Sequence, residues 1–515
     1  MHHPLEDDGR VGEAVASLGG EEAGAVSKAE ERFERWRQTI GLFAGPAAFA
    51  IVWALPFATM SAQAHRLAAV VSLVVVWWVS EAIPIPATAL VGSALTVLMG
   101  IASAQDAYAP FASPTIFLFM GSFMIGRAAS EHGLDRRLAV SVLSIGAVRG
   151  NVARIRLAMA GLCLVVSAWM SNTATTAMML PVALGVLTAT RATRGPDRRY
   201  ASGFMLMVAY AASIGGLMTP VGSPPNLITL GLLERTVGIR INFFSWMLVM
   251  IPIALAMAAA MFALDRFWFP PPGEARTLPA SYVRHQQTND PWTRGQRNCA
   301  IAFLTAVVLW ITPGVVALAG YDQTPVGRLL AARLDEAVVA VIAASLLFLL
   351  PTDWGTRRFT LGWRAASQID WGTILLFGGG LSLGRLMFTT GLAEHVGRAL
   401  VAASGAESLW AVTAISVAVG IALTEITSNT AATNMLVPVV LSICQVERLN
   451  PVAPALGACV GASMAFMLPI STPPNAIVYG TGLVPITTMI RFGVAMDIVA
   501  FFIVLGGLRL LCPLL

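Results

Sequence analysis

Two copies of the tripeptide Ser-Asn-Thr, at 171–173 and 428–430, each interrupt a long apolar stretch of the chain. We call them the first and second tripeptides. Their hydroxyl and amide oxygens can ligate a hard cation such as sodium, and the Asn amide and Thr hydroxyl can donate to a carboxylate. One such tripeptide alone is more often a helix kink whose Asn bonds to the nearby backbone. The residues around each tripeptide must therefore show whether it has a structural or a functional role.

The surroundings of the two tripeptides match. Each Asn is followed after nine residues by a proline, Pro181 or Pro438. Further on, each half contains a Pro-Pro-Asn segment, at 224–226 and 473–475. Upstream, the apolar stretches Ile116–Gly121 and Ile374–Gly379 also correspond. Three paired features in the same order indicate an internal duplication.

The composition predicts an integral membrane protein. Of 515 residues, 56% are hydrophobic and 12% are charged, whereas soluble domains have about 25% charged residues. Length and hydropathy predict helices, because open strands leave backbone groups unpaired in lipid. The predicted apolar segments are 40–60, 66–83, 85–102, 114–130, 155–190, 203–233, 244–268, 299–319, 335–351, 372–390, 409–446, 454–484 and 488–512, with a polar loop at 269–298.

The charges fit a membrane better than a nucleic acid. The net charge of +5 comes from arginines between apolar segments, where they set topology and meet anionic lipid. Residues 1–38 are expected to form a soluble tail with a basic end and a cytoplasmic N-terminus, without a cleavable signal. Arginines on both sides of 155–190 leave the topology there open. The five cysteines have no metal-ligand spacing.

Breaks in apolar helices point to a binding site. Irregular backbone at membrane depth persists where it lines a protein cavity, and the half-helix ends attract ions of opposite charge. Paired breaks in two related halves are typical of a transporter. An odd number of crossings per half would make the repeats inverted. Gly121 and Gly378–Gly380 further predict two re-entrant hairpins, at 114–130 and 372–390.

Together these motifs, with Glu81–Leu90, resemble the divalent anion:sodium symporters, the sodium–dicarboxylate cotransporter group, over residues 40–512. The resemblance implies an all-α polytopic membrane protein, a homodimer with two inverted repeats and an elevator mechanism. The first repeat would be 39–240, with scaffold spans 40–102 and transport elements 114–233. The second would be 241–512, with scaffold spans 244–351, transport elements 370–485 and a terminal helix at 488–512.

The resemblance also implies site residues. A first sodium ion would be held by Ser167, Ser171, Asn172 and the Gly222 carbonyl, and a second by Thr424, Thr427, Ser428, Asn429 and the Ser471 carbonyl. The substrate would touch Asn172, Thr173, Asn429 and Thr430, with Ser223, Pro224, Thr472 and Pro473 lining the pocket. Neither tripeptide contains a basic residue. Helix dipoles and co-bound sodium ions would therefore compensate the charge of a di-anion.

The expected function is sodium-driven uptake of a four-carbon dicarboxylate across a bacterial inner membrane, with two or more sodium ions and no organic cofactor. A sodium-independent dicarboxylate exchanger, a sodium-coupled carrier of sulfate, citrate or tartrate, and an anion channel remain alternatives. An intramembrane hydrolase is disfavoured, because the spans contain no nucleophile with a base and no catalytic carboxylate pair. Glu425, three residues before Ser428, is expected to bond to a neighbouring helix end, with a proton-linked step as the alternative.

Overall fold

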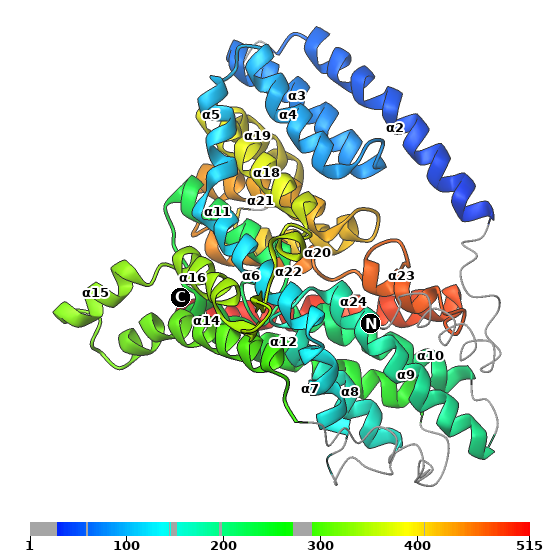
Figure 1. Ribbon diagram of the computed structural model, residues 1–515. Coiled ribbons are helices and arrows are strands. Elements are labelled where there is room, and N and C mark those ends of the chain that lie inside the picture. Colours follow the sequence, from blue (N-terminus) through cyan, green and yellow to red (C-terminus); the bar gives the residue numbers. More distant parts are fainter. Residues whose placement is uncertain are drawn as a thin grey trace.

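The computed structural model describes residues 28–57, 60–143, 145, 152–194, 198–270, 291–405 and 407–515, and within these ranges the fold is almost entirely helical (Figure 1). Seven helices among the described residues are long and apolar enough to cross a membrane. The one sheet in this part of the chain pairs two short strands, β1 (Pro351–Asp353) and β2 (Arg358–Phe359). Most of the predicted loop at 269–298 lies outside the described residues.

The helices of the first half agree well with the predicted segments. They are α2 (Lys28–Ala54), α3 (Ala62–Ser80), α4 (Ile85–Leu98), α5 (Ala104–Tyr108), η1 (Ala109–Ala112), α6 (Pro114–Glu131), α7 (Leu134–Leu143), α8 (Val152–Ser167), α9 (Asn172–Arg194), α10 (Arg198–Gly215), α11 (Pro224–Val237) and α12 (Phe243–Trp268). The basic flank 28–38 is not part of a separate tail, because α2 runs through it into the first apolar segment.

The second half follows the same order. Its helices are α14 (Arg294–Leu318), α15 (Pro325–Arg333), α16 (Glu336–Leu349), α17 (Trp363–Ala366), α18 (Trp371–Thr389), α19 (Leu392–Ser404), α20 (Leu409–Thr424), α21 (Asn429–Val446), α22 (Val452–Gly461), α23 (Pro473–Tyr479), α24 (Ile486–Leu511) and η2 (Cys512–Leu514). The predicted helix breaks at both tripeptides are confirmed, since α8 gives way to α9 and α20 to α21 at these positions. The segments 203–233 and 454–484 are broken as well, each just before its Pro-Pro-Asn segment.

The predicted hairpin turns at the central glycines are wrong. Helix α6 continues through Gly121, and α18 continues through Gly378–Gly380. The chain reverses later, at Gly133 and Gly391, where φ is +63° and +82°. These glycines have the left-handed backbone that residues with a Cβ rarely adopt. The central glycines permit close helix packing instead.

Helices from the two halves interlock around the breaks. Helix α11 packs against α21, and α23 packs against α9, so each Pro-Pro-Asn helix contacts the tripeptide helix of the other half. Helices α12 and α24 also contact each other. In Figure 1 the α2–α4 group lies at one edge, and α4 contacts the remainder through α18.

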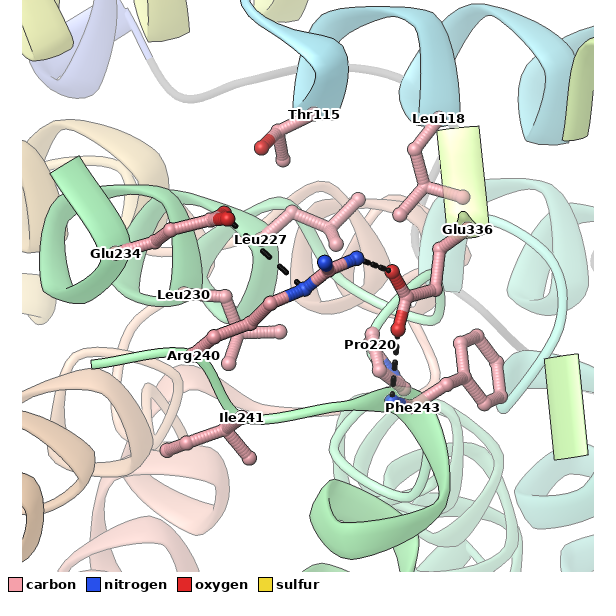
Figure 2. Close-up of a pocket in the computed structure, with 10 residues that line it drawn as sticks. All are labelled: Thr115, Leu118, Pro220, Leu227, Leu230, Glu234, Arg240, Ile241, Phe243 and Glu336. Atoms are coloured by element: carbon pink, nitrogen blue, oxygen red, sulfur yellow. Dashed lines mark hydrogen bonds and ion pairs between the residues drawn. The ribbon is translucent and has the colours of Figure 1, made fainter. Parts of the chain in front are cut away.

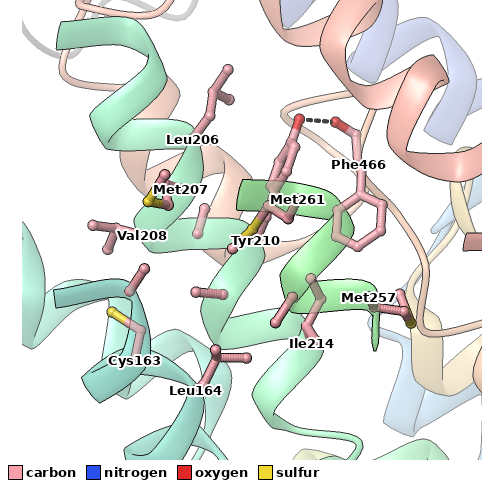
Figure 3. Packing of buried hydrophobic residues seen from close by; sticks show 14 of the residues in the cluster. Cys163, Leu164, Leu206, Met207, Val208, Tyr210, Ile214, Met257, Met261 and Phe466 are labelled. Atoms are coloured by element: carbon pink, nitrogen blue, oxygen red, sulfur yellow. Dashed lines mark hydrogen bonds between the residues drawn. The ribbon is translucent and has the colours of Figure 1, made fainter. Parts of the chain in front are cut away.

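Helix α10 forms the centre of the largest buried cluster (Figure 3). Tyr210 of α10 packs on Phe466, and its hydroxyl donates to the Phe466 carbonyl. Met257 and Met261 of α12 fill the space beside it. Many large apolar side chains of α2 and α14 are instead exposed. This distribution fits helices that face lipid, where an apolar surface is favourable.

We predict that Gly121→Ala lowers the melting temperature of the detergent-solubilised protein. An added Cβ would lie 2.6 Å from the carbonyl of Ala340 in α16, and such overpacking costs about 1–3 kcal/mol. Gly126→Ala in the same helix is the matched control, because its Cβ would meet nothing within 4 Å. Alanine also favours helix over glycine. Equal melting temperatures for both variants would contradict the close contact between α6 and α16.

Candidate functional site

At the first tripeptide, a side-chain hydrogen bond spans the helix break. The Ser167 hydroxyl, in the last turn of α8, donates to Oδ1 of Asn172 at 2.7 Å. Asn172 opens α9, and its backbone carbonyl accepts from the Thr176 hydroxyl at 2.9 Å. Two side-chain oxygens therefore lie together where one half-helix ends and the next begins.

The second tripeptide repeats this arrangement. The Thr424 hydroxyl, at the end of α20, donates to Oδ1 of Asn429 at 2.7 Å. Asn429 opens α21, and its carbonyl accepts from the Thr433 hydroxyl at 2.8 Å. The matched contacts show that Ser167 and Thr424 have the same structural position in the two breaks.

Both tripeptide asparagines keep donor groups for a ligand. Asn172 and Asn429 use Oδ1 as the acceptor described above. Within the described part of the chain, their amide nitrogens make no hydrogen bond, and both side chains are only half-buried. Each amide thus has two N–H groups that can donate to an anion.

The asparagines of the Pro-Pro-Asn segments, in contrast, use their amide groups to bond to backbone carbonyls. The amide of Asn226 donates to the carbonyls of Gly216 and Thr219, both at 2.8 Å. The amide of Asn475 donates to the carbonyls of Ala465 and Leu468, at 2.9 and 3.0 Å. Both side chains are fully buried. They stabilise the turns before α11 and α23 and have no amide proton left for a substrate.

These two turns pack directly on the broken helices. The Thr219 hydroxyl donates to the Ala168 carbonyl, just beyond the end of α8. Gly216 lies so close to Asn172 that a Cβ there would overlap its Oδ1. A Cβ on Gly222 would lie 2.9 Å from the Ala168 carbonyl. Gly222 is therefore next to the first break, where the family resemblance implies that its carbonyl binds a cation.

Glu425 stabilises the corresponding turn of the second half. Its buried carboxylate accepts the backbone N–H groups of Phe466, Met467 and Leu468 at 2.8, 2.9 and 3.2 Å. The Ser471 hydroxyl adds a bond of 2.7 Å to the carboxylate and one of 3.1 Å to the Glu425 carbonyl. Glu425 therefore has the expected structural role of bonding to a neighbouring helix end. Its two bonds to Ser471 hold that residue beside the second break.

The other predicted residues have more local roles. The Ser428 hydroxyl accepts from the Ala431 backbone N–H and caps α21. The Thr427 hydroxyl donates to the carbonyl of Trp78 in α3 at 3.2 Å, so its proton is already used in a bond to another helix. The remaining predicted residues are exposed Ser171 and Pro473, half-buried Thr173, Thr430 and Pro224, buried Thr472, whose hydroxyl caps α23, and buried Ser223, which precedes α11 without a side-chain capping bond.

Helix ends supply the electrostatics of this region. The C-terminal ends of α8 and α20 carry partial negative charge, whereas the N-terminal ends of α9 and α21 carry partial positive charge. Each break therefore presents a cation-attracting and an anion-attracting end within five residues, from Ser167 to Asn172 and from Thr424 to Asn429. Within the described residues, no hydrogen bond joins one tripeptide to the other.

A pocket in the described structure is lined mainly by residues of α6, α11, α12 and α16 and by none of the tripeptide residues (Figure 2). None of the residues predicted to line a substrate pocket lines this one, although Pro220 belongs to the turn just before α11. Arg240 extends into it and pairs with Asp335 and Glu336 at 2.8 Å and with Glu234 at 3.9 Å. Because three carboxylates surround this guanidinium, the pocket is a poor anion receptor.

The ion pairs of Arg240 also affect its pKa. Partial burial alone would lower the pKa of this half-exposed guanidinium, but Glu336, then Asp335 and Glu234, raise the pKa of Arg240 above its ordinary value. The residue stays cationic and links the α11–α12 connection to the start of α16. Its role here is structural.

Sequence reasoning missed Thr219, Gly216 and Asp497. Thr219 and Gly216 gave no sequence signal of their own, because their contacts depend on how the turn folds back onto α8. Asp497 did give a signal, since a carboxylate inside a long apolar helix is a functional hypothesis by default. It lies within α24 and is buried.

Comparison with known families decides the class of protein. The model of the sodium:sulfate symporter transmembrane region matches residues 37–511. The chain belongs to the divalent anion:sodium symporter family. It is an integral membrane protein, as its apolar helices and this family indicate.

Named relatives agree with that placement. An uncharacterized transporter of Haemophilus influenzae is 32% identical, with 88% of this chain and 93% of the relative covered. The sodium-dependent dicarboxylate transporter SdcS of Staphylococcus saprophyticus is 28% identical, with 95% and 94% covered. SdcS of Staphylococcus aureus strain USA300 is 27% identical, with 91% and 90% covered.

Solved structures share the fold. The Alcanivorax borkumensis YdaH transporter aligns with a TM-score of 0.55 at 16% identity, covering 81% of this chain and 87% of that one. Neisseria gonorrhoeae MtrF aligns with a TM-score of 0.53 at 12% identity, covering 81% and 83%. At these identities the likeness concerns architecture alone.

We predict that Asn226→Ala and Asn475→Ala reduce the stability of the detergent-solubilised protein. Each change removes two hydrogen bonds in a buried turn and leaves one carbonyl, that of Gly216 or Ala465, without a donor, at about 1–3 kcal/mol for the group left unpaired. Thermal unfolding should show a clear decrease in melting temperature. Asn450→Ala is the control, since exposed Asn450 makes one local bond, to the Val452 N–H. Wild-type stability of both buried variants would refute their role in holding the turns.

Proposed function

We propose that this protein is a secondary active transporter that couples inward sodium movement to uptake of a four-carbon dicarboxylate such as succinate, malate or fumarate. The observation that carries the proposal is the matched pair of asparagines, Asn172 and Asn429. The Oδ1 of each asparagine lies with another side-chain oxygen at a helix break, and its amide nitrogen has no hydrogen bond in the described structure. Family membership and the sodium-dependent dicarboxylate transporters among the relatives support it.

In this proposal each break binds one sodium ion. The first ion is ligated by Ser167, Ser171, Asn172 and the Gly222 carbonyl, and the second by Thr424, Thr427, Ser428, Asn429 and the Ser471 carbonyl. The 2.7 Å contacts at both breaks support this, because each brings together two neutral oxygens that suit a hard cation. Thr427 contributes its backbone oxygen, since its hydroxyl bonds to Trp78.

The dicarboxylate is bound between the two breaks. One carboxylate accepts from the Asn172 amide and Thr173, and the other from the Asn429 amide and Thr430. Ser223, Pro224, Thr472 and Pro473 line this space from the facing helix starts. Neither the tripeptides nor the Pro-Pro-Asn segments contain lysine or arginine. Sodium ions and helix N-termini therefore compensate a di-anion that would otherwise be costly to bury.

The proposed architecture is a homodimer whose protomers contain two inverted repeats. The reciprocal packing of α11 on α21 and of α23 on α9 supports an internal pseudo-symmetry. In the elevator mechanism, the transport elements 114–233 and 370–485 shift as a unit against the scaffold spans 40–102 and 244–351. The N-terminus is cytoplasmic, and the membrane is the bacterial plasma membrane.

Sodium symport is favoured over sodium-independent exchange. The four proposed side-chain ligands Ser167, Ser171, Thr424 and Ser428 all carry oxygen, whereas an exchanger would be expected to replace some of them with a cationic or bulky residue. Carriage of sulfate, citrate or tartrate is the alternative within the same mechanism. Competition of each anion with labelled succinate would rank these substrates.

We predict that proteoliposomes containing the full chain accumulate labelled succinate only when an inward sodium gradient is present. The physical reason is that sodium ions supply the charge compensation that the protein lacks at the site. The measurement is initial uptake with external sodium against external choline. Saturable uptake with a sodium dependence steeper than one-to-one would also distinguish the carrier from an anion channel. Equal uptake in both solutions would contradict symport.

Two variants test the location of the site. Asn172→Ala and Asn429→Ala are expected to reduce uptake to the level of empty liposomes, with an unchanged elution profile on gel filtration. Asn450→Ala should transport normally, because it removes an exposed amide far from both breaks in sequence. Near-normal uptake by either site variant would show that the substrate binds elsewhere.

A further inference from the structure

The second break is bonded to a pair of helices from the other half of the chain. The Arg37 guanidinium of α2 donates from one nitrogen, Nη1, to the carbonyls of Val79 and Ile426, both at 3.3 Å. The Thr427 hydroxyl donates to the Trp78 carbonyl at 3.2 Å. The bonded pairs across the halves are 389 and 349 positions apart in the chain. Two consecutive residues just before the second tripeptide are therefore held by α2 and α3.

Arg37 lies near the C-terminal ends of two helices. Val79 is in the last turn of α3, and Ile426 comes shortly after the end of α20 at Thr424. Carbonyls at helix C-terminal ends carry partial negative charge and need donors from outside the helix. A guanidinium can supply such donors, and a cation at this end of a helix is stabilising. Arg37 thus connects the end of α3 to the end of α20.

Two carboxylates hold Arg37 in this position. Glu34, one turn earlier in α2, accepts from Nη2 of Arg37 at 2.9 Å, and a Glu81 oxygen lies 3.6 Å from the same nitrogen. Glu81 directly follows α3 and has a φ of +49°, in the left-handed region that is uncommon for residues with a Cβ. The Arg37 side chain is only 16% exposed. Its orientation toward the second break is therefore set by α2 and α3 themselves.

The contacts with α2 and α3 leave the Thr427 carbonyl open to a ligand. The backbone amides of Ile426 and Thr427 both donate to the Leu423 carbonyl, at 3.2 and 3.1 Å. The Ile426 carbonyl and the Thr427 hydroxyl bond to the other half, as described above. Within the described residues, the Thr427 carbonyl accepts no hydrogen bond. A backbone oxygen of this kind is a suitable ligand for a hard cation.

The first break is held differently. Trp169 and Met170 have the positions there that Ile426 and Thr427 have at the second break. Trp169 stacks on Phe243 of α12, with ring centroids 6.0 Å apart, and meets the edge of Phe303 of α14 at 5.2 Å. Met170 has no hydroxyl group to donate. Apolar contacts therefore hold the first break, whereas hydrogen bonds from an arginine and to a helix end hold the second.

We propose that Arg37 is a positioning residue for the second sodium site. It holds Ile426 and Thr427 so that the open Thr427 carbonyl faces the ion. The effect on sodium rests on the proposed function above, because it acts through the second sodium site. The contact between Arg37 and the second break does not depend on transport, so the two can be tested separately.

Hydrogen–deuterium exchange of the full chain in detergent tests the contact. Arg37→Met keeps an apolar side chain of similar length without a donor, and it should increase exchange several-fold in peptides covering 423–430. Peptides covering 166–173, at the first break, should exchange as in the wild type. Arg66→Met is the matched control, because the Arg66 guanidinium also donates to a backbone carbonyl, that of Met99 at 3.0 Å, without touching the second break.

Two exchange results would overturn the contact. One is wild-type exchange at 423–430 in Arg37→Met. The other is an equal increase at both breaks, because the variant would then loosen the whole protein and not the second break.

Transport kinetics test the positioning role. Arg37→Met should raise the sodium half-saturation of succinate uptake about fivefold. Thr427→Val, which keeps the carbonyl and loses the bond to Trp78, should raise it as well. Arg37→Lys should stay within about twofold of the wild type, because Nη1 alone makes both carbonyl bonds and an ammonium group can replace it. At saturating sodium, the succinate half-saturation of all three should match the wild type, and Arg66→Met should be unchanged throughout.

Equal sodium half-saturation in Arg37→Met and the wild type would overturn the positioning role. An equal rise in Arg37→Lys and Arg37→Met would also contradict it, because the donor would then not matter. If sodium had no effect on wild-type uptake, the proposed function would fail while the exchange result could still show the contact.

Discussion

The structure depends on one constraint, namely that every backbone group freed by a broken helix in the membrane must find a partner. At the two turns before α11 and α23, buried side chains meet this need. Asn226 and Asn475 donate to carbonyls, and Glu425 accepts N–H groups. The side chains that complete this network cannot also bind substrate. The amides of Asn172 and Asn429 have no such task, which is why the site is proposed there.

The two halves meet the same constraint with matching backbone bonds, and the second half adds a carboxylate. After α10, the amides of Leu217 and Met218 bond to the carbonyls of Ile214 and Gly215. After α22, the amides of Ser463 and Met464 bond in the same way to the carbonyls of Val460 and Gly461. The Glu425 carboxylate then accepts the following amides, those of Phe466 and Met467. A carboxylate is thus placed beside the second break and not beside the first.

Much of this could be predicted from the sequence, because apolar length and polar interruptions reveal helices and their breaks directly. The breaks at both tripeptides were placed correctly. The central glycines were misinterpreted, since glycine in an apolar helix permits either a turn or a close helix contact, and only the neighbour decides. Gly121 lies against Ala340, which is 219 residues away in the chain. The contacts of Thr219 likewise depend on distant elements that no local pattern specifies. The predicted sodium and substrate residues stay predictions, although the structure brings the members of each break together.

In the proposed mechanism the two breaks form a single binding unit in which sodium creates the affinity for the anion. Equilibrium binding of labelled succinate to the purified protein, measured across sodium concentrations at constant ionic strength, tests this most directly. The account predicts that succinate affinity rises steeply with sodium and is nearly lost in choline, because binding free energies of coupled ligands are linked. Equal affinity in sodium and choline would contradict it.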